Sequence, residues 1–124
     1  MSRPQASPFL DRSRWISQNE FAAALRDEYP VTKGHTLIVP RRVVPSLFSL
    51  SEREIIACWE LLMKEKERLD KELSPDGYNI GVNIGSAAGQ TITHAHIHLI
   101  PRFDGDHPSP RGGVRAVIPE KASY

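Results

Sequence analysis

The sequence is poor in features that define several large classes of protein. Its single cysteine, Cys58, allows neither an internal disulfide nor a zinc site built from CxxC pairs or four thiolates. No stretch approaches the roughly 20 apolar residues needed to span a bilayer. The polar, proline-containing start MSRPQASPFL does not resemble a signal peptide. We therefore predict a cytoplasmic protein that does not associate with membranes.

An excess of charge of either sign is also missing. Lys and Arg number 16 and Asp and Glu number 15, which gives a formal net charge of +1. Such a balance provides no broad field for holding nucleic acid, so any recognition of phosphate has to be local. The 40% hydrophobic content, without repeats or linkers, predicts one domain over residues 1–124. Residues 1–8 and 103–124 are expected to form irregular tails.

Three of the five histidines lie in one short run, HAHIHLI, over residues 94–100. His94, His96 and His98 alternate with apolar residues, and successive side chains of a β-strand point to opposite faces. On a helix, steps of roughly 100° would scatter the three imidazoles. The run therefore predicts a strand over residues 92–101 with all three histidines on one face.

The rest of the chain alternates short strand patterns with one long helical pattern. Ser51, followed three residues later by Glu54, is typical of a capping box at a helix start. The predicted helix buries its apolar stripe against a sheet and exposes Lys and Glu. At helical spacing the stripe contains Ile55, Trp59, Leu62, Lys66, Leu69 and Leu73. Further strands are predicted over residues 15–17, 20–26, 35–40 and 78–84.

This order of elements favours an α+β domain. We expect an antiparallel sheet of about five strands, with the long helix over residues 51–73 and a short helical turn within residues 45–50 packed on it. Repeated βαβ units are absent from the pattern, which argues against a doubly wound sheet.

Clustered imidazoles can divide chemical roles, because a pKa of about 6.5 lets one attack while another donates a proton. Two alternatives stay open: histidines two residues apart also match a zinc-ligand spacing, or the three rings pack structurally. The preceding loop GSAAGQT lets backbone N–H groups approach phosphate closely, and it also fits a flexible hairpin turn. Neutral donors near this loop are Asn83, Gln90 and Thr91.

Three segments, GHTLIVP, NIGVNIGSAAGQT and HAHIHLIPR, resemble the histidine triad (HIT) superfamily of nucleotidyl hydrolases and transferases. The resemblance implies that His96 attacks the α-phosphorus and forms a nucleotidyl-imidazole intermediate. It implies that His98 contacts the phosphate and helps to protonate the leaving group, and that His94 orients the strand and ligand contacts. His35 would hydrogen-bond near His96 and fix its tautomer; the alternative is a surface histidine at a strand end.

The same resemblance assigns a binding role to other positions. Asp27 would bind the ribose hydroxyls, unless it is an ordinary loop-capping aspartate. No metal ion is required, because a neutral imidazole can attack a phosphodiester anion without repulsion; Mg²⁺ is expected only on a polyphosphate substrate. A homodimer through the long helix and the adjacent strand is also implied. Phosphate-binding positions are Asn83, Gly89, Gln90 and Thr91, and those of the apolar base pocket are Phe9, Leu10 and Leu25.

The C-terminal segment RFDGDHPSPRGGVRAVIPEK resembles a bacterial branch of diadenosine polyphosphate hydrolases. We therefore predict cleavage at the α-phosphate of a dinucleoside polyphosphate such as diadenosine tetraphosphate. Arg111 and Arg115 could reach the distal phosphates or belong to a solvated basic loop, and His107 is expected on the surface. Open alternatives are a purine nucleoside phosphoramidase, a dinucleoside polyphosphate phosphorylase, a nucleotide-binding regulatory module and a metal-binding protein.

Overall fold

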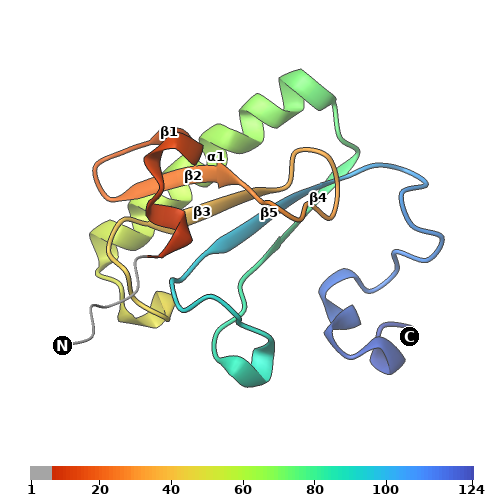
Figure 1. Cartoon of the computed structure of the whole chain (residues 1–124). Coiled ribbons are helices and arrows are strands. Elements are labelled where there is room, and N and C mark those ends of the chain that lie inside the picture. Colours follow the sequence, from red (N-terminus) through yellow and green to blue (C-terminus); the bar gives the residue numbers. More distant parts are fainter. Residues whose placement is uncertain (1–6) are drawn as a thin grey trace.

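A five-stranded antiparallel sheet in the order β1-β2-β3-β5-β4 forms the centre of the computed structural model, which describes residues 7–124. One long helix lies across one face of the sheet (Figure 1). The elements are β1 (Trp15–Gln18), β2 (Ala22–Arg26), β3 (Thr36–Pro40), α1 (Glu52–Leu73), β4 (Gly77–Gly81) and β5 (Ile97–Arg102). The predicted α+β class is confirmed, and the short turn within residues 45–50 is a 3-10 turn at Leu47–Ser49.

Helix α1 begins where its capping box predicts. Ser51 Oγ accepts a hydrogen bond from the Glu54 N–H at 3.2 Å, and Glu54 Oε1 accepts one from the Ser51 N–H at 3.0 Å. The Arg42 guanidinium also binds this carboxylate, and together these bonds lower the pKa of Glu54 to about 2. The helix ends at Leu73 and is capped by Ser74, whose φ of 47° is left-handed.

The face that α1 turns toward the sheet differs from the predicted one. Ile55 and Trp59 are 48% and 50% exposed, so the expectation that they pack on the sheet is wrong. Leu62 and Leu69 are buried as predicted, and Leu73 packs on the same cluster. The rest of the buried stripe is rotated around the helix away from Ile55 and Trp59, and it includes two glutamates that an apolar pattern does not reveal. The buried residues of α1 are Glu54, Ala57, Cys58, Leu61, Leu62, Glu65 and Leu69.

The sheet separates two apolar clusters because its side chains alternate between faces. The cluster under α1 receives Ala22, Ala24, Ile38, Ile97 and Leu99. The opposite cluster receives Ala23, Leu25, Leu37 and Val39, together with Phe9 from the N-terminal turn. Both faces are therefore covered in part by chain outside the sheet, and the second face is the one on which the histidines lie.

Four strands are shorter than predicted: β2 and β3 begin at Ala22 and Thr36, and the differences in β4 and β5 affect the histidine segment. Strand β4 ends at Gly81 instead of residue 84, and β5 begins at Ile97 instead of residue 92. The Ala95 N–H donates to the Val44 carbonyl at 2.7 Å, so the chain before β5 is tied to the loop after β3. His94 and His96 consequently precede the strand, and only His98 lies within it.

The ends of the chain are partly ordered into turns. The predicted C-terminal irregular tail contains two 3-10 turns, at Gly113–Val117 and Pro119–Lys121. Of the predicted N-terminal tail, residues 1–6 lie outside the described part of the chain. No helix within residues 7–124 has the length and apolar character required to cross a bilayer.

Candidate active site around the histidines

A cavity of about 370 Å³ opens on the sheet face that carries Leu37 and is covered in part by Phe9. It gathers nearly every predicted site residue; only His94, Leu10 and Leu25 are missing from its lining. The predicted residues that line it are Phe9, Asp27, His35, Asn83, Gly89, Gln90, Thr91, His96 and His98. Residues from both halves of the sequence therefore meet in one cavity.

The His96 ring presents an unprotonated nitrogen. Its Nδ1 lies 2.8 Å from the His94 carbonyl oxygen, which can only accept, so the proton of the neutral ring is on Nδ1. Nε2 therefore keeps its lone pair. The ring is 9% exposed and lies edge-on against Phe9 and His98, with centroids 4.9 and 5.0 Å away. A partly exposed imidazole nitrogen with a lone pair is a competent nucleophile.

His94 holds the segment that carries His96 in place. Its Nε2–H donates to the Pro40 carbonyl at 2.6 Å, and its Nδ1 accepts from the Ser7 hydroxyl at 2.6 Å. The side chain is fully buried, and burial lowers its pKa. With both ring nitrogens bound to the protein, His94 joins β3, the N-terminal turn and the chain before β5. A role in direct ligand contact is not supported by this position.

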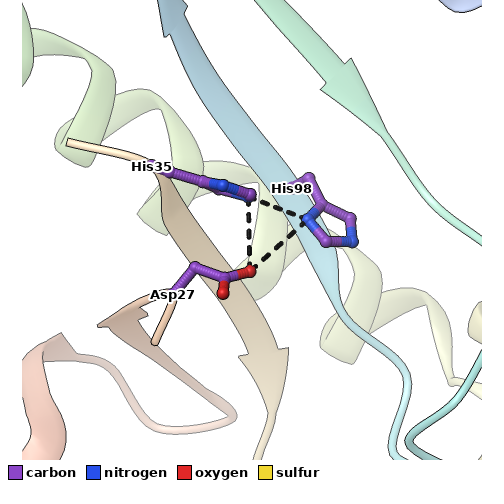
Figure 2. Close-up of side chains that lie close together, drawn as sticks. All are labelled: Asp27, His35 and His98. Atoms are coloured by element: carbon purple, nitrogen blue, oxygen red, sulfur yellow. Dashed lines mark hydrogen bonds and ion pairs between the residues drawn. The ribbon is translucent and has the colours of Figure 1, made fainter. Parts of the chain in front are cut away.

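His35 and His98 form the second pair of imidazoles, beside Asp27 (Figure 2). The nitrogens His35 Nε2 and His98 Nδ1 are 2.9 Å apart. Asp27 Oδ2 lies 3.5 Å from the first and 4.0 Å from the second. The expectation that His35 fixes the tautomer of His96 is therefore wrong; the backbone carbonyl of His94 does so, and His35 binds His98.

The protons of this pair can be assigned from its neighbours. The Val31 N–H donates to His35 Nδ1 at 3.0 Å, so the neutral His35 ring carries its proton on Nε2 and donates it to His98 Nδ1. His98 then carries its own proton on Nε2, the nitrogen that points away from Asp27 in Figure 2. Burial and the neighbouring His96 and His35 lower the pKa of His98 to about 4. Burial also lowers the pKa of His35.

Gly34 sets the position of His35. Its φ is +91°, and a Cβ there would lie 2.7 Å from a Leu73 methyl carbon and 2.9 Å from a Leu69 methyl carbon. The chain therefore reaches His35 only by passing close to the end of α1. His35 is 3% exposed, so the interpretation as a surface histidine is wrong. Asp27 does cap its loop, because Oδ1 accepts from the Tyr29 N–H at 2.8 Å, while Oδ2 faces the histidines.

Asp27, His35 and His98 are also the one group within residues 7–124 whose ligand atoms all lie within 4.8 Å of one another, as a metal site requires. The hydrogen bonds oppose that use. A metal needs the lone pair of His35 Nε2, yet the Val31 N–H occupies Nδ1 and forces the proton onto Nε2. Binding a cation here would break the bond to Val31, so the residues fit a hydrogen-bonded relay better than a metal centre.

The loop before β5 is braced more firmly than its composition predicts. The side-chain amide of Gln90 donates to the Pro45 and Ile92 carbonyls at 2.8 and 3.1 Å. Its oxygen accepts from the Gly85 N–H at 2.9 Å. Gln90 thus has no amide hydrogen left for phosphate, contrary to expectation, and it acts on the shape of the loop. Asn83 and Thr91 remain as side-chain donors in the cavity lining.

The apolar wall of the cavity matches the prediction only at Phe9. Leu25 is fully buried in the cluster behind Phe9, and Leu10 is 36% exposed outside the lining. Leu37 and Ile92 line the cavity instead, and no local motif marks either residue as part of a site. Leu25 lies on the same sheet face as its register partner Leu37, but it is fully buried and does not reach the cavity.

Two charged residues at this cavity escaped sequence reasoning. Arg14 and Glu28 both line it and form an ion pair with an N–O distance of 3.5 Å. The Arg14 guanidinium also donates to the Pro8 and Arg26 carbonyls, each at 3.3 Å. No motif links positions 14 and 28, because only the pairing of β1 with β2 brings them together.

Comparison with known proteins agrees with this geometry. The family model described as "HIT domain" matches residues 11–105. The bis(5'-nucleosyl)-tetraphosphatase (asymmetrical) of Schizosaccharomyces pombe is 34% identical over 100 residues, which cover 81% of this chain and 55% of that protein. The bis(5'-adenosyl)-triphosphatase of Dictyostelium discoideum is 33% identical over 103 residues, covering 82% and 69%.

Among solved structures, the crystal structure of a HIT family protein from Bacillus anthracis superposes with a TM-score of 0.75 at 30% identity, covering 81% of this chain and 75% of that one. The chain thus spans little more than half of the length of the Schizosaccharomyces pombe protein, 55%. The matched range contains the three histidines of the HAHIHLI run and both partners of His98 in Figure 2.

Proposed function

Because the chain belongs to the histidine triad family, we propose that it is a nucleotide hydrolase that cleaves dinucleoside polyphosphates at the α-phosphate. The observation that carries this proposal is the tautomer of His96. Its Nδ1–H is held by the His94 carbonyl at 2.8 Å, which leaves Nε2 with a lone pair at the cavity. The names of the Schizosaccharomyces pombe and Dictyostelium discoideum relatives support the same substrate class.

The reaction takes two displacements on one phosphorus atom. His96 Nε2 attacks the α-phosphorus with its lone pair, and the bond from that phosphorus to the bridging oxygen breaks. The leaving polyphosphate keeps the electron pair. Water then attacks the phosphorus of the nucleotidyl-histidine, the phosphorus–nitrogen bond returns its pair to Nε2, and a nucleoside monophosphate and one proton are released.

His98 favours a polyphosphate as the leaving group. Its pKa near 4 keeps the ring neutral at pH 7, with one proton on Nε2. Such a ring can stabilise the departing oxygen by a hydrogen bond, in the manner of a preorganised donor, but it cannot give up that proton cheaply. A polyphosphate leaves as an anion without needing one. An amine has to be protonated, so phosphoramidase activity is the less favoured alternative.

The covalent step can be tested by mixing the protein with diadenosine tetraphosphate for a single turnover and stopping the reaction with alkali, in which phosphorus–nitrogen bonds survive. Mass spectrometry of the intact protein and of its peptides then detects any adduct. We expect an adenylyl adduct on the peptide containing His96. The adduct should be absent from His96→Asn and present in His107→Asn, a change at an exposed histidine. Hydrolysis that proceeds at the normal rate without any adduct, with inversion at a chiral α-phosphorothioate, would contradict the proposal.

The remaining alternatives differ in measurable ways. A phosphorylase should turn over faster when inorganic phosphate is added, and a hydrolase should not. A regulatory binding module should keep its cellular role in the His96→Asn variant, whereas an enzyme should lose it while retaining nucleotide affinity. A metal-binding protein should contain stoichiometric zinc after purification. We expect Mg²⁺ to act only by binding the polyphosphate of the substrate.

A homodimer is the proposed assembly. Exposed apolar side chains gather along one side of α1, at Ile55, Ile56, Trp59 and Met63, each 48–54% exposed. Strand β4 is an edge of the sheet, so its outer backbone groups can pair with a second copy. Light scattering after gel filtration should give a dimer mass for the wild type and for Lys71→Glu. Trp59→Glu should give a monomer; a monomeric wild type would refute the assembly.

A further inference from the structure

A second cavity, also of about 370 Å³, adjoins the first one. The two cavities share His35, Asn83 and His98, so a ligand leaving the first cavity past His98 enters the second. The second cavity lies between the sheet at Ile100 and the C-terminal segment, the RGGVR stretch whose role the proposed function leaves open. In Figure 1 this segment is the dark blue chain beyond β4.

The C-terminal segment is folded into a defined wall. Gly112 and Gly113 have φ of 91° and 52°, and a Cβ on Gly112 would collide with the Ala122 carbonyl oxygen. The guanidinium groups of Arg111 and Arg115 lie 4.7 and 5.0 Å from the centre of the Tyr124 ring. The two arginines therefore stabilise the fold of the segment, and neither lines the cavities beside His98.

This wall turns apolar side chains toward the cavity without covering them. Val114 and Val117 both line the second cavity, yet they are 62% and 77% exposed. Apolar side chains at a cavity gain free energy when a ligand removes them from water. The lining contains no acidic residue among the described positions, so an adjoining polyphosphate meets no carboxylate there.

We propose that the second cavity holds the second nucleoside of a dinucleoside polyphosphate, with its base against the wall formed by Val114 and Val117. The inference rests on the proposed function and adds a binding site for the nucleoside that departs with the leaving polyphosphate. The two nucleosides are recognised differently. The first has Asp27 and Phe9 beside it, whereas the second is held by aliphatic contacts and by position beyond His98.

A matched pair of substrates tests the inference. Adenosine tetraphosphate has the polyphosphate of diadenosine tetraphosphate but lacks the second nucleoside. We expect the wild type to prefer diadenosine tetraphosphate by at least about ten-fold in kcat/KM. A substitution in the wall should reduce the ratio of the two values, because any effect on the polyphosphate or on His96 is common to both substrates.

Neighbouring residues provide a matched pair of variants. Val117→Asp and Val117→Ser should bring the ratio to within about two-fold of unity. Ile118→Asp places the same charge one residue further along, at a 54% exposed side chain outside the cavity lining, and should keep the wild-type ratio. An unchanged ratio in both Val117 variants, or an equal loss in Ile118→Asp, would overturn the inference.

Binding separates this inference from the proposed function. In the His96→Asn background, calorimetry should show tighter binding of diadenosine tetraphosphate than of adenosine tetraphosphate, and Val117→Asp should remove the difference. Absence of turnover in the wild type would refute the hydrolase while this difference in affinity still supports the second cavity. Turnover of diadenosine tetraphosphate with equal affinities for the two nucleotides would refute the cavity alone.

Discussion

The two faces of the sheet are built from alternating residues of the same strands, yet one is packed with apolar side chains and the other carries hydrogen-bonded histidines. Under α1 most contacts are between leucine, isoleucine and alanine side chains, and Leu69 and Leu99 are fully buried there. On the other face the buried groups include His35 and His94, each bonded through both ring nitrogens. On the first face, burial of apolar side chains stabilises the fold. On the second face, hydrogen bonds determine which ring nitrogens carry a proton.

The hydrogen bonds on the histidine face leave two ring nitrogens at the cavity. Within residues 7–124, only the Nε2 atoms of His96 and His98 have no protein partner among the four clustered imidazoles. One has a lone pair and the other has a proton, as their Nδ1 partners require. The difference between the faces predicts that substitutions on one should alter stability and those on the other should alter reactivity.

The sharpest test of this division is His96→Asn. Removing the nitrogen lone pair should lower kcat/KM by at least about 1,000-fold, or ~4 kcal/mol of transition-state stabilisation. The free energy of unfolding should change by less than about 1 kcal/mol, because the ring makes a single hydrogen bond to the protein. Steady-state kinetics and urea unfolding measure the two quantities. His107→Asn serves as the control, and a large loss of stability in His96→Asn would break the division.

Leu69→Ala should give the opposite result. Leu69 is fully buried between α1 and the sheet, so its truncation leaves a cavity that costs about 2 to 5 kcal/mol of unfolding free energy. The kcat/KM of the folded fraction should stay within about two-fold of the wild type. Leu10→Ala, at a 36% exposed position, is the control and should cost far less. A ten-fold fall in kcat/KM for Leu69→Ala, measured where the variant is fully folded, would show that packing under α1 affects the histidine face.

A change of pH should weaken the histidine face specifically. The pKa of His98 is about 4 in the folded protein, against about 6.5 when unfolded, so the unfolded chain binds more protons between these values. The contribution of His98 to the free energy of unfolding is therefore present above about pH 6.5 and is lost as the pH falls toward 4. At pH 5 the loss from His98 alone is about 2 kcal/mol. Urea unfolding at pH 8 and pH 5 should show it, and His98→Asn should show a smaller difference; an equal difference would refute this origin.

The sequence predicted most reliably what depends on local chemistry. The capping box at Ser51 and Glu54 acts within one turn, and both of its hydrogen bonds form. The strand pattern of TLIVP likewise became β3, because β-branched residues favour a pleated strand wherever it pairs. The gathering of His35 with the HAHIHLI histidines also followed from the family resemblance, which encodes the three-dimensional arrangement.

What the sequence could not predict depends on rotation and on distant partners. The face that α1 buries is one example: it includes Glu65, whose carboxylate accepts a hydrogen bond from the Ser17 hydroxyl of β1 at 2.7 Å. The partner of His35 depends on the register of β3 against β5, which sets Leu37 opposite His98. Gln90 offers donors in the sequence, but carbonyls 45 and two residues away have already taken them.

The smallest expected effect concerns the start of α1, which makes no contact with the histidines in the proposed mechanism. Ser51→Ala removes the acceptor for the Glu54 N–H and should lower the unfolding free energy by about 1 kcal/mol. Arg42 still holds the Glu54 carboxylate at 2.8 Å, so the helix should keep its start. Thermal unfolding detects this loss, with Ser49→Ala as the control. A change in kcat/KM larger than the change in stability would mean that the capped end of α1 positions the histidines, and the separation of the two faces would no longer hold.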